Sequence, residues 1–183
     1  MADSLAGLEV EELGGADSIA DVGAGAGFPG LPLAIALPAA RVDLIESARR
    51  KCEVSRRLAA AAEVENARAV PTRAEEWAAA DGREAYEAVT ARAVAPLAVL
   101  LEYAAPLLSV GGALVAWKGA RDGAEEAAAE RAAQILGMGP ARVLAVVPFA
   151  AARNRHLHVY TKGEPTPPRF PRRPGAARKR PLG

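Results

Sequence analysis

The chain contains few cysteine, histidine and aromatic residues, and these low counts limit the classes of protein to which it can belong. It has one cysteine, Cys52, two histidines and 4% aromatic residues among 183 residues. A lone cysteine cannot form an internal disulfide, so we expect a reducing environment and interpret Cys52 as a small buried helix residue. Proline, glycine or charge interrupts each apolar stretch well short of the ~20 residues of a membrane helix. The acidic start, Met1–Leu13, also lacks the apolar run of a secretory signal. These absences predict a soluble, cytoplasmic protein.

Positive and negative charges are unevenly distributed, although the formal net charge is only +1. From Arg153 to the end there are nine basic residues and one acidic residue, Glu164. Clusters of this kind attract phosphate backbones without regard to base sequence. A solvated, disordered terminus explains the charges equally well, so both interpretations remain open.

Short apolar or β-branched runs alternate with longer segments of helical period, which is typical of a parallel sheet flanked by helices. We predict strands at Ser18–Val22, Arg41–Glu46, Arg68–Pro71, Ala85–Ala91, Ala113–Trp117, Arg142–Val147 and His156–Thr161. We predict helices at Leu31–Leu37, Ala48–Glu63, Ala74–Ala80, Pro96–Leu108 and Glu125–Leu136. The expected fold class is therefore α/β, with a mostly parallel seven-stranded sheet and helices on both faces.

Glycine and proline mark two expected breaks in this pattern. Gly111 and Gly112 follow the predicted Pro96–Leu108 helix, where we expect a left-handed helix end. From Gly163 onward the sequence is rich in proline and arginine. We expect this segment to have no regular structure and to lie extended over the surface or stay mobile.

The most informative local pattern is DVGAGAGFPG, residues 21–30, directly after the first predicted strand. Gly23, Gly25 and Gly27 stand at every second position in it. Glycine lets the backbone turn sharply and lets a ligand approach without interference from Cβ. In an open parallel sheet, ligands bind at the carboxyl ends of the strands. The pattern therefore predicts a ligand-binding loop.

Two motifs fit this loop. Gly25, Gly27 and Gly30 satisfy the dinucleotide pattern G-x-G-x-x-G, which is weak evidence by itself. Asp21 and the alternating glycines after it fit the methyltransferase pattern D-x-G-x-G-x-G. Glu46, at the end of the second predicted strand, suits the ribose hydroxyls of either NAD or S-adenosylmethionine. A nicotinamide-dependent dehydrogenase and a methyltransferase are both compatible with these residues.

Residues after the later strands separate the two alternatives. Ala74 and Glu75 follow the third strand, where a backbone N–H and a carboxylate suit an adenine edge. Arg92 and Lys118 end the fourth and fifth strands, and cations there suit phosphates or the carboxylate of the cofactor's methionine part. No tyrosine–lysine or cysteine–histidine pair suggests hydride transfer. The pattern favours a methyltransferase.

Eight segments, in order along the chain, resemble one family: the 16S ribosomal RNA guanine-N7 methyltransferases, also called glucose-inhibited division protein B. The segments are DSLAGL, DVGAGAGFPGLPLAIALP, LIESARRK, RAEEW, VTARAVAPLAVLLEYAAPLL, GGALVAWKG, RHLHVYTK and PPRFPRRPGAARKRPL. They cover essentially the whole chain, and several are far more specific than the glycine loop. The chain begins almost at the DSL motif, which in the family follows a helical segment of some tens of residues.

The resemblance implies a Rossmann-like class I fold that uses S-adenosylmethionine to methylate guanine N7 in a decoding-region loop of 16S ribosomal RNA. We accordingly expect a methyltransferase domain at residues 1–162 and a basic, proline-rich tail at residues 163–183. The expected partner is 16S ribosomal RNA or the small ribosomal subunit, with no membrane, and the expected state is a monomer. Two alternative functions are methylation of a different substrate (another RNA, a protein or a small molecule) and RNA binding by a protein that uses the fold as a scaffold without a cofactor.

The resemblance and the loop pattern together also name site residues. Cofactor contacts are expected at Asp21, Gly23, Gly25, Gly27, Phe28, Glu46, Ala74, Glu75 and Arg92. RNA phosphates are expected to bind six cations, Arg92, Lys118, Arg153, Arg155, Arg172 and Arg173.

The expected chemistry makes few demands on side chains. Guanine N7 has a lone pair and no proton, so its methylation needs no general base. We therefore predict no catalytic residue and no metal site, and we expect structural or RNA-facing roles for His156 and His158. Because the tail carries much of the positive charge, removing the last twenty residues should weaken RNA binding and leave cofactor affinity nearly intact.

Overall fold

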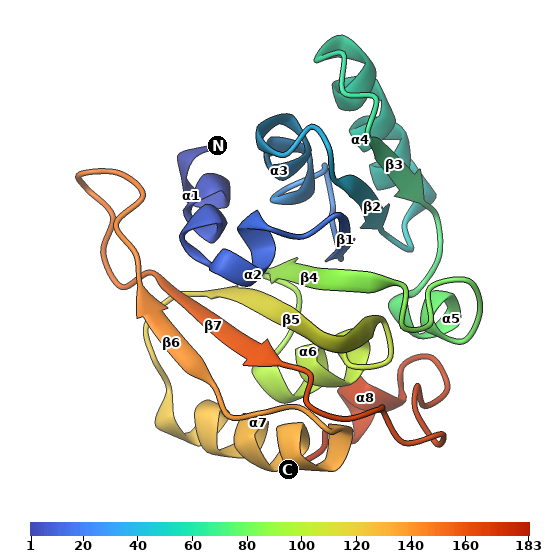
Figure 1. Ribbon diagram of the computed structural model, residues 1–183, viewed down its shortest axis with the longest axis vertical. Helices are drawn as coiled ribbons and strands as arrows, with labels where there is room; N and C mark the ends of the chain where they lie inside the picture. Colours follow the sequence, from blue (N-terminus) through green and yellow to red (C-terminus); the bar gives the residue numbers. More distant parts are fainter.

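The computed structural model describes residues 1–183, which form one seven-stranded sheet (Figure 1). The strands are β1 (Ser18–Val22), β2 (Arg41–Ile45), β3 (Ala67–Val70), β4 (Tyr86–Arg92), β5 (Leu108–Lys118), β6 (Arg142–Ala145) and β7 (His156–Thr161). Their order is β3-β2-β1-β4-β5-β7-β6. The first five strands pair in parallel, whereas β7 is antiparallel to both β5 and β6. The predicted α/β fold with a mostly parallel sheet is confirmed.

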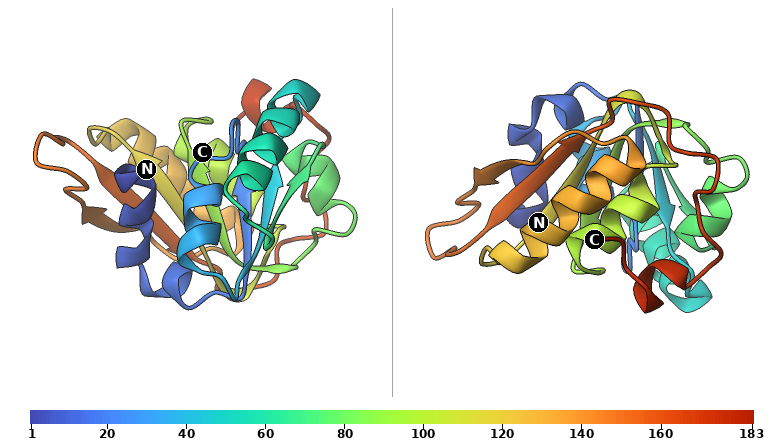
Figure 2. Two further views of the ribbon diagram at one scale, coloured as in Figure 1. Left: turned by 90° about the horizontal axis from the view of Figure 1, so that it is seen from above. Right: turned by 90° about the horizontal axis from the view of Figure 1, so that it is seen from below.

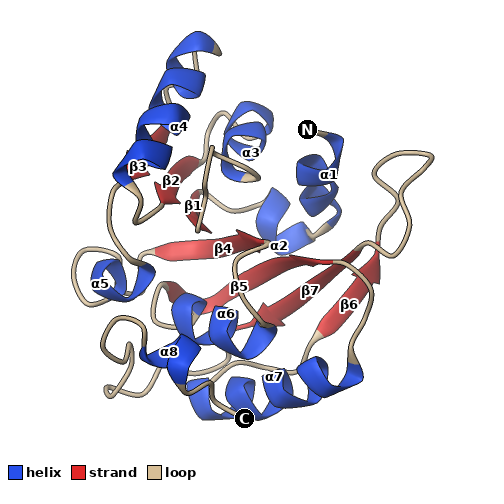
Figure 3. Ribbon diagram, turned by 180° about the vertical axis from the view of Figure 1, so that it is seen from behind, coloured by secondary structure: helices blue, strands red, loops and turns tan.

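Helices cover both faces of the sheet (Figures 2 and 3). One face carries α1 (Ala2–Leu5), the 3₁₀ helix η1 (Ala6–Glu9), α2 (Glu11–Gly14), α3 (Gly30–Ala36) and α4 (Arg49–Ala61). The other carries α5 (Ala74–Ala78), α6 (Leu97–Ala104), α7 (Gly123–Leu136) and α8 (Ala176–Lys179). None of these helices combines the length and apolar character needed to span a membrane.

Alternating side chains on β5 join the two halves of the core. Leu114 and Ala116 belong to a cluster of 29 buried residues on the α6–α7 face. Ala113, Val115 and Trp117 belong to a cluster of 20 on the opposite face. A strand buried on both sides is expected for a sheet covered by helices on both faces.

The predicted Pro96–Leu108 helix is too long, and its predicted glycine stop is wrong. The helix α6 ends at Ala104, and Pro106, two residues later, has no N–H with which to continue the helical hydrogen bonds. The next strand begins at Leu108, so both predicted stop glycines lie inside β5. Gly111 does have a positive φ of 90°. A Cβ on Gly112 would lie 2.7 Å from a carbonyl of β4, so glycine is needed where the two strands approach closely.

The expectation of an irregular chain end is also partly wrong. Residues 176–179 form the short helix α8, and Ala176 and Ala177 are buried. Phe170 is only 2% exposed, so the segment is packed against the body. The aromatic and alanine side chains supply apolar surface that a Pro/Arg-rich composition conceals. The three short helical segments before β1 were likewise not predicted.

Candidate active site

The three alternating glycines of the loop after β1 all have left-handed backbone, which permits the sharp turn expected from the sequence. Gly23, Gly25 and Gly27 have φ values of 69°, 59° and 96°. A Cβ on Gly23 would lie 2.6 Å from the Val94 side chain, and one on Gly27 would lie 2.5 Å from Leu31. A Cβ on Gly25 would meet only a carbonyl oxygen at 3.9 Å. Two glycines thus allow close packing, and Gly25 leaves open space beside bare backbone.

Asp21 supports this loop from below. Its side chain is fully buried; one oxygen accepts a hydrogen bond from the Gly30 N–H (2.9 Å) and the other from the Thr90 hydroxyl (3.0 Å). Burial raises the pKa of Asp21 to about 7, against the opposing effect of these hydrogen bonds. Asp21 therefore connects β1, β4 and the start of α3, and it does not line the pocket described next.

A pocket of about 430 Å³ opens beside the loop at the carboxyl ends of β1, β2 and β4. We call it the Glu46 pocket; its lining includes Gly23, Glu46, Ala74, Glu75, Ala93 and Arg178. Four of the nine residues predicted to bind cofactor are among these six. The structure thus brings together residues that are far apart in the chain, as a site at the carboxyl edge of a parallel sheet requires.

Glu46 is held rigidly in this pocket. It is 8% exposed, and its two carboxylate oxygens accept hydrogen bonds from the N–H groups of Gly25 (3.2 Å) and Ala48 (2.8 Å). The Lys51 ammonium lies 3.9 Å away. Because each oxygen has a second lone pair, the carboxylate can still accept hydrogen bonds from a ligand.

The C-terminal tail forms part of one wall of the Glu46 pocket. The Gly175 N–H donates to Glu75 (2.8 Å), and the Arg178 guanidinium donates to the Val94 carbonyl (3.0 Å). Both acceptors line the pocket, and so does Arg178. A residue of the tail thus lines the same pocket as four of the residues predicted to bind the cofactor.

A second pocket, of about 300 Å³, lies on the other side of Ala93. We call it the Arg92 pocket; its lining includes Asp3, Arg92, Trp117, Lys118, Arg155 and His156. Ala93 lines both pockets and has a φ of 56°, which is uncommon for a residue other than glycine. Such strained backbone is frequent at functional sites.

Three of the six cations predicted to bind RNA meet in the Arg92 pocket, in different charge environments. Arg92 pairs with Asp3 (3.1 Å) and lies 5.7 Å from the centre of the Phe28 ring. Lys118 pairs with Glu125 (2.6 Å), whereas Arg155 is exposed and forms no ion pair. Arg155 is thus the cation most available to a phosphate.

The other three predicted RNA cations lie elsewhere. Arg153 is exposed in the β6–β7 loop, which projects from the body in Figure 1, and bonds to carbonyls of that loop. Arg172 pairs with both carboxylate oxygens of Glu102, a buried residue of α6. Arg173 is exposed in the tail. The structure therefore does not gather all six on one surface.

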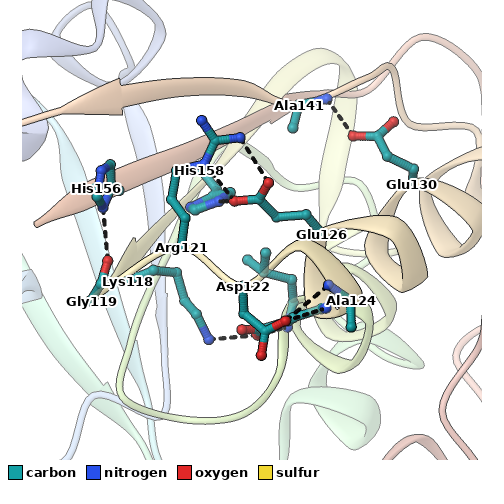
Figure 4. Close-up of polar contacts among 12 residues, drawn as sticks. Lys118, Gly119, Arg121, Asp122, Ala124, Glu126, Glu130, Ala141, His156 and His158 are labelled. Carbon is teal, nitrogen blue, oxygen red and sulfur yellow. Dashed lines mark hydrogen bonds and ion pairs between the residues drawn. The ribbon is translucent and has the colours of Figure 1, made fainter. Parts of the chain in front are cut away.

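The two histidines of β7 make structural contacts, shown in Figure 4. His156 Nδ1 lies 2.8 Å from the Gly119 carbonyl oxygen. His158 is 1% exposed, and its Nε2 lies 3.0 Å from the carboxylate of Glu126. The hydrogen bond that Glu126 accepts from Arg121 has the largest effect on its pKa, and together with the contact to His158 it lowers that pKa to about 2. These contacts join β7 to α7 and to the end of β5.

Sequence reasoning missed several lining residues. Asp3, Val94, Tyr103 and Arg178 lie in segments that resemble the family, but nothing in those segments marks them as part of a pocket. Arg178 was visible only as one of nine basic residues near the chain end. Its position depends on contacts with residues about 100 places earlier in the chain, which no local pattern reports.

Solved structures of low sequence identity share the fold. A crystal structure of the S-adenosylmethionine-dependent methyltransferase SibL in its apo form matches with a TM-score of 0.70 at 16% identity, covering 88% of this chain and 55% of that one. A predicted O-methyltransferase from Agrobacterium tumefaciens matches with a TM-score of 0.69 at 23% identity, covering 89% and 81%. These similarities confirm the Rossmann-like class I methyltransferase fold.

Sequence relatives are closer. The family model described as rRNA small subunit methyltransferase G matches residues 1–158. The ribosomal RNA small subunit methyltransferase G of Pelotomaculum thermopropionicum is 44% identical over 182 residues, which are 98% of this chain and 76% of the relative. That of Chloroflexus aggregans is 45% identical, covering 90% and 69%. The resemblance inferred from the sequence motifs is confirmed: the chain belongs to the ribosomal RNA small subunit methyltransferase G family.

Proposed function

We propose that this chain transfers the methyl group of S-adenosylmethionine to N7 of a guanine in 16S ribosomal RNA. The observation that supports this most directly is the meeting of two pockets at Ala93. One pocket has a glycine loop and a buried carboxylate, and the other has three cations. A methyl donor in the first and an RNA base in the second would lie side by side.

The Glu46 pocket fits the donor by the chemistry of its lining. The open space at Gly25 lets a ligand approach the backbone, and the fixed Glu46 carboxylate suits two sugar hydroxyls. Ala74 and Glu75 offer polar groups to an adenine edge, beside apolar surface from Val94. When bound, S-adenosylmethionine supplies an electrophilic methyl group on a sulfonium.

The residues of this chain then need to align the two reactants, and they do not need to transfer a proton. Guanine N7 attacks through an existing lone pair, so the rate depends on proximity and orientation and on exclusion of water. The strained turn at Ala93 holds the end of β4 between the two reactants. Asp21 keeps the glycine loop in place through Gly30 and Thr90.

The cations of the Arg92 pocket would hold the RNA. Arg155 is available to a phosphate as it stands, whereas Arg92 and Lys118 would exchange their pairing with Asp3 and Glu125 for phosphate contacts. The Phe28 ring lies beside Arg92. A guanine in structured RNA must be extruded to enter, at a cost of a few kcal/mol. We further propose that the protein acts as a cytoplasmic monomer.

Family membership favours this function over a nicotinamide-dependent dehydrogenase. A direct test is tritium transfer from labelled S-adenosylmethionine to small subunits that lack the modification, followed by mapping of N7-methylguanosine. Label at N7 of a single guanine in 16S RNA is the expected result. Label in another RNA or in protein would contradict the proposal, as would thermal stabilisation by NAD but not by S-adenosylhomocysteine.

A further inference from the structure

The chain after β7 runs along the α5–α6 side of the protein (Figure 2), and buried contacts hold it there. Lys162 is 1% exposed, and its ammonium donates to the carbonyls of Ala105 (2.9 Å) and Leu108 (2.6 Å). Phe170 is also buried, and its carbonyl accepts a hydrogen bond from Arg83 (3.0 Å). These contacts give the following residues a defined position.

Beyond these contacts the tail reaches the wall of the Glu46 pocket. The Gly175 N–H donates to Glu75, and α8 then packs beside α6 (Figure 3). This places the Arg178 guanidinium against the Val94 carbonyl. Arg178 is also close enough to Tyr103 to oppose the increase in pKa that burial causes in that phenol.

Arg178 has no acidic partner. Arg172 pairs with Glu102 and Lys162 with Glu84, but Arg178 forms no ion pair. A guanidinium has five N–H donors and two planar faces. The Val94 carbonyl accepts a hydrogen bond from only one of these donors. The pocket wall therefore carries a planar cation with capacity for a ligand.

We propose that Arg178 is a cofactor-binding residue whose guanidinium packs against the adenine ring of S-adenosylmethionine. This inference rests on the proposed location of the cofactor in the Glu46 pocket. Planar guanidinium groups stack on aromatic rings, which an ammonium group cannot do. Val94 and Tyr103 add apolar surface to the same wall, and Glu75 borders it. This wall suits a flat base better than a carboxylate or a phosphate.

RNA is the other ligand that an exposed arginine attracts. The cations that meet in the Arg92 pocket lie on the other side of Ala93. Arg178 instead contacts Val94 and follows Gly175, which binds Glu75. Its surroundings belong to the Glu46 pocket, so the cofactor is the better-supported ligand.

Calorimetric titration of the full chain with S-adenosylhomocysteine tests the proposal. We expect Arg178→Ala to weaken Kd about tenfold, which corresponds to about 1.4 kcal/mol. Lys179→Ala is a matched control, since Lys179 is the next residue of α8, is exposed and forms no side-chain hydrogen bond or ion pair. It should bind like the wild type. Arg178→Lys should recover little affinity, because the lysine ammonium group is charged but not planar and so cannot stack on the adenine ring. An unchanged Kd in Arg178→Ala, or a full recovery with lysine, would overturn the proposal.

A smaller ligand tests the assignment to adenine. 5′-Methylthioadenosine keeps the nucleoside but lacks the amino-acid part, so Arg178→Ala should weaken both ligands by the same factor. A loss seen only with S-adenosylhomocysteine would contradict the adenine assignment. Glu46→Gln separates this inference from the proposed function. If Glu46→Gln binds normally, the proposed cofactor pocket is wrong; if it weakens binding while Arg178→Ala does not, only the role of Arg178 is wrong.

Discussion

The backbone N–H of Gly175 donates a 2.8 Å hydrogen bond to the carboxylate of Glu75, 100 residues earlier in the chain. The bond joins the basic tail to the first turn of α5, at the edge of the Glu46 pocket. A segment that composition marks as a disordered, RNA-binding end is thus part of the folded body. Its removal would expose buried surface and open the pocket wall, so it should not spare cofactor affinity.

Arg172→Ala should destabilise the protein. It leaves the Glu102 carboxylate, only 2% exposed, without its guanidinium partner. Loss of one partner from a buried ion pair costs about 3–5 kcal/mol, and because Arg172 is partly solvated we expect about 2 kcal/mol. Urea unfolding measures this. Arg173→Ala, at the exposed neighbouring position, should change stability by less than about 0.5 kcal/mol. Equal midpoints for the two variants would show that the pair contributes little.

Gly25→Ala should weaken cofactor binding more than it affects folding. The positive φ of 59° makes alanine unfavourable by about 1 kcal/mol. The added methyl group meets no protein atom closer than 3.9 Å, so it would occupy the space beside the loop. We expect affinity for S-adenosylhomocysteine to fall about tenfold or more, as for a clash with a close-fitting ligand.

Gly111→Ala provides the matched control for that variant. Gly111 has a φ of 90° and nothing within 4 Å of its ideal Cβ, but it lies at the opposite end of the sheet in β5. It should show a similar loss of stability in thermal unfolding and normal cofactor affinity. The same affinity in both variants would mean that no ligand approaches Gly25.

Arg155→Ala should weaken binding to 16S RNA and reduce the slope of log K against log salt by about one, because one phosphate contact is lost. Lys118→Ala should change the slope less, since Glu125 already neutralises that ammonium. Arg131→Ala, an exposed position on α7, serves as the control. Filter binding over a series of salt concentrations measures all three. A slope that Arg155→Ala leaves unaltered would remove Arg155 from the RNA site.

Asp21→Asn should change the pH dependence of stability. The folded pKa of Asp21, about 7, exceeds the ordinary value of 3.8, so the folded state holds a proton that the unfolded state has released. Stability from this group is therefore fully present below about pH 4 and is lost as pH rises to about 7, by about 4 kcal/mol. Asparagine cannot ionise, so the Asp21→Asn variant should lack this decline. Unfolding free energies of both proteins at about pH 4.5 and about pH 7.5 measure the difference. Parallel changes would mean that Asp21 has an ordinary pKa.

Local sequence determined much of the sheet and the binding loop. The strands Ser18–Val22 and His156–Thr161 occur where predicted, because runs of apolar and β-branched residues are short-range signals. Alternating glycines likewise predicted a sharply turning loop, and the positive φ values found there are ones that only backbone without Cβ adopts readily. Pro106 is a local signal for the end of α6 as well, but the prediction placed that end at Leu108, before Gly111 and Gly112, instead.

Tertiary structure alone decided where charges and buried acids act. Asp21 belongs to a loop motif, yet its contacts with Gly30 and Thr90 place it under the loop rather than in the pocket. Arg172 and Arg178 look alike in sequence, but one neutralises a buried acid and the other lines the Glu46 pocket. A backbone conformation depends on neighbours in the chain, whereas the partner of a charge depends on which distant surfaces packing brings together.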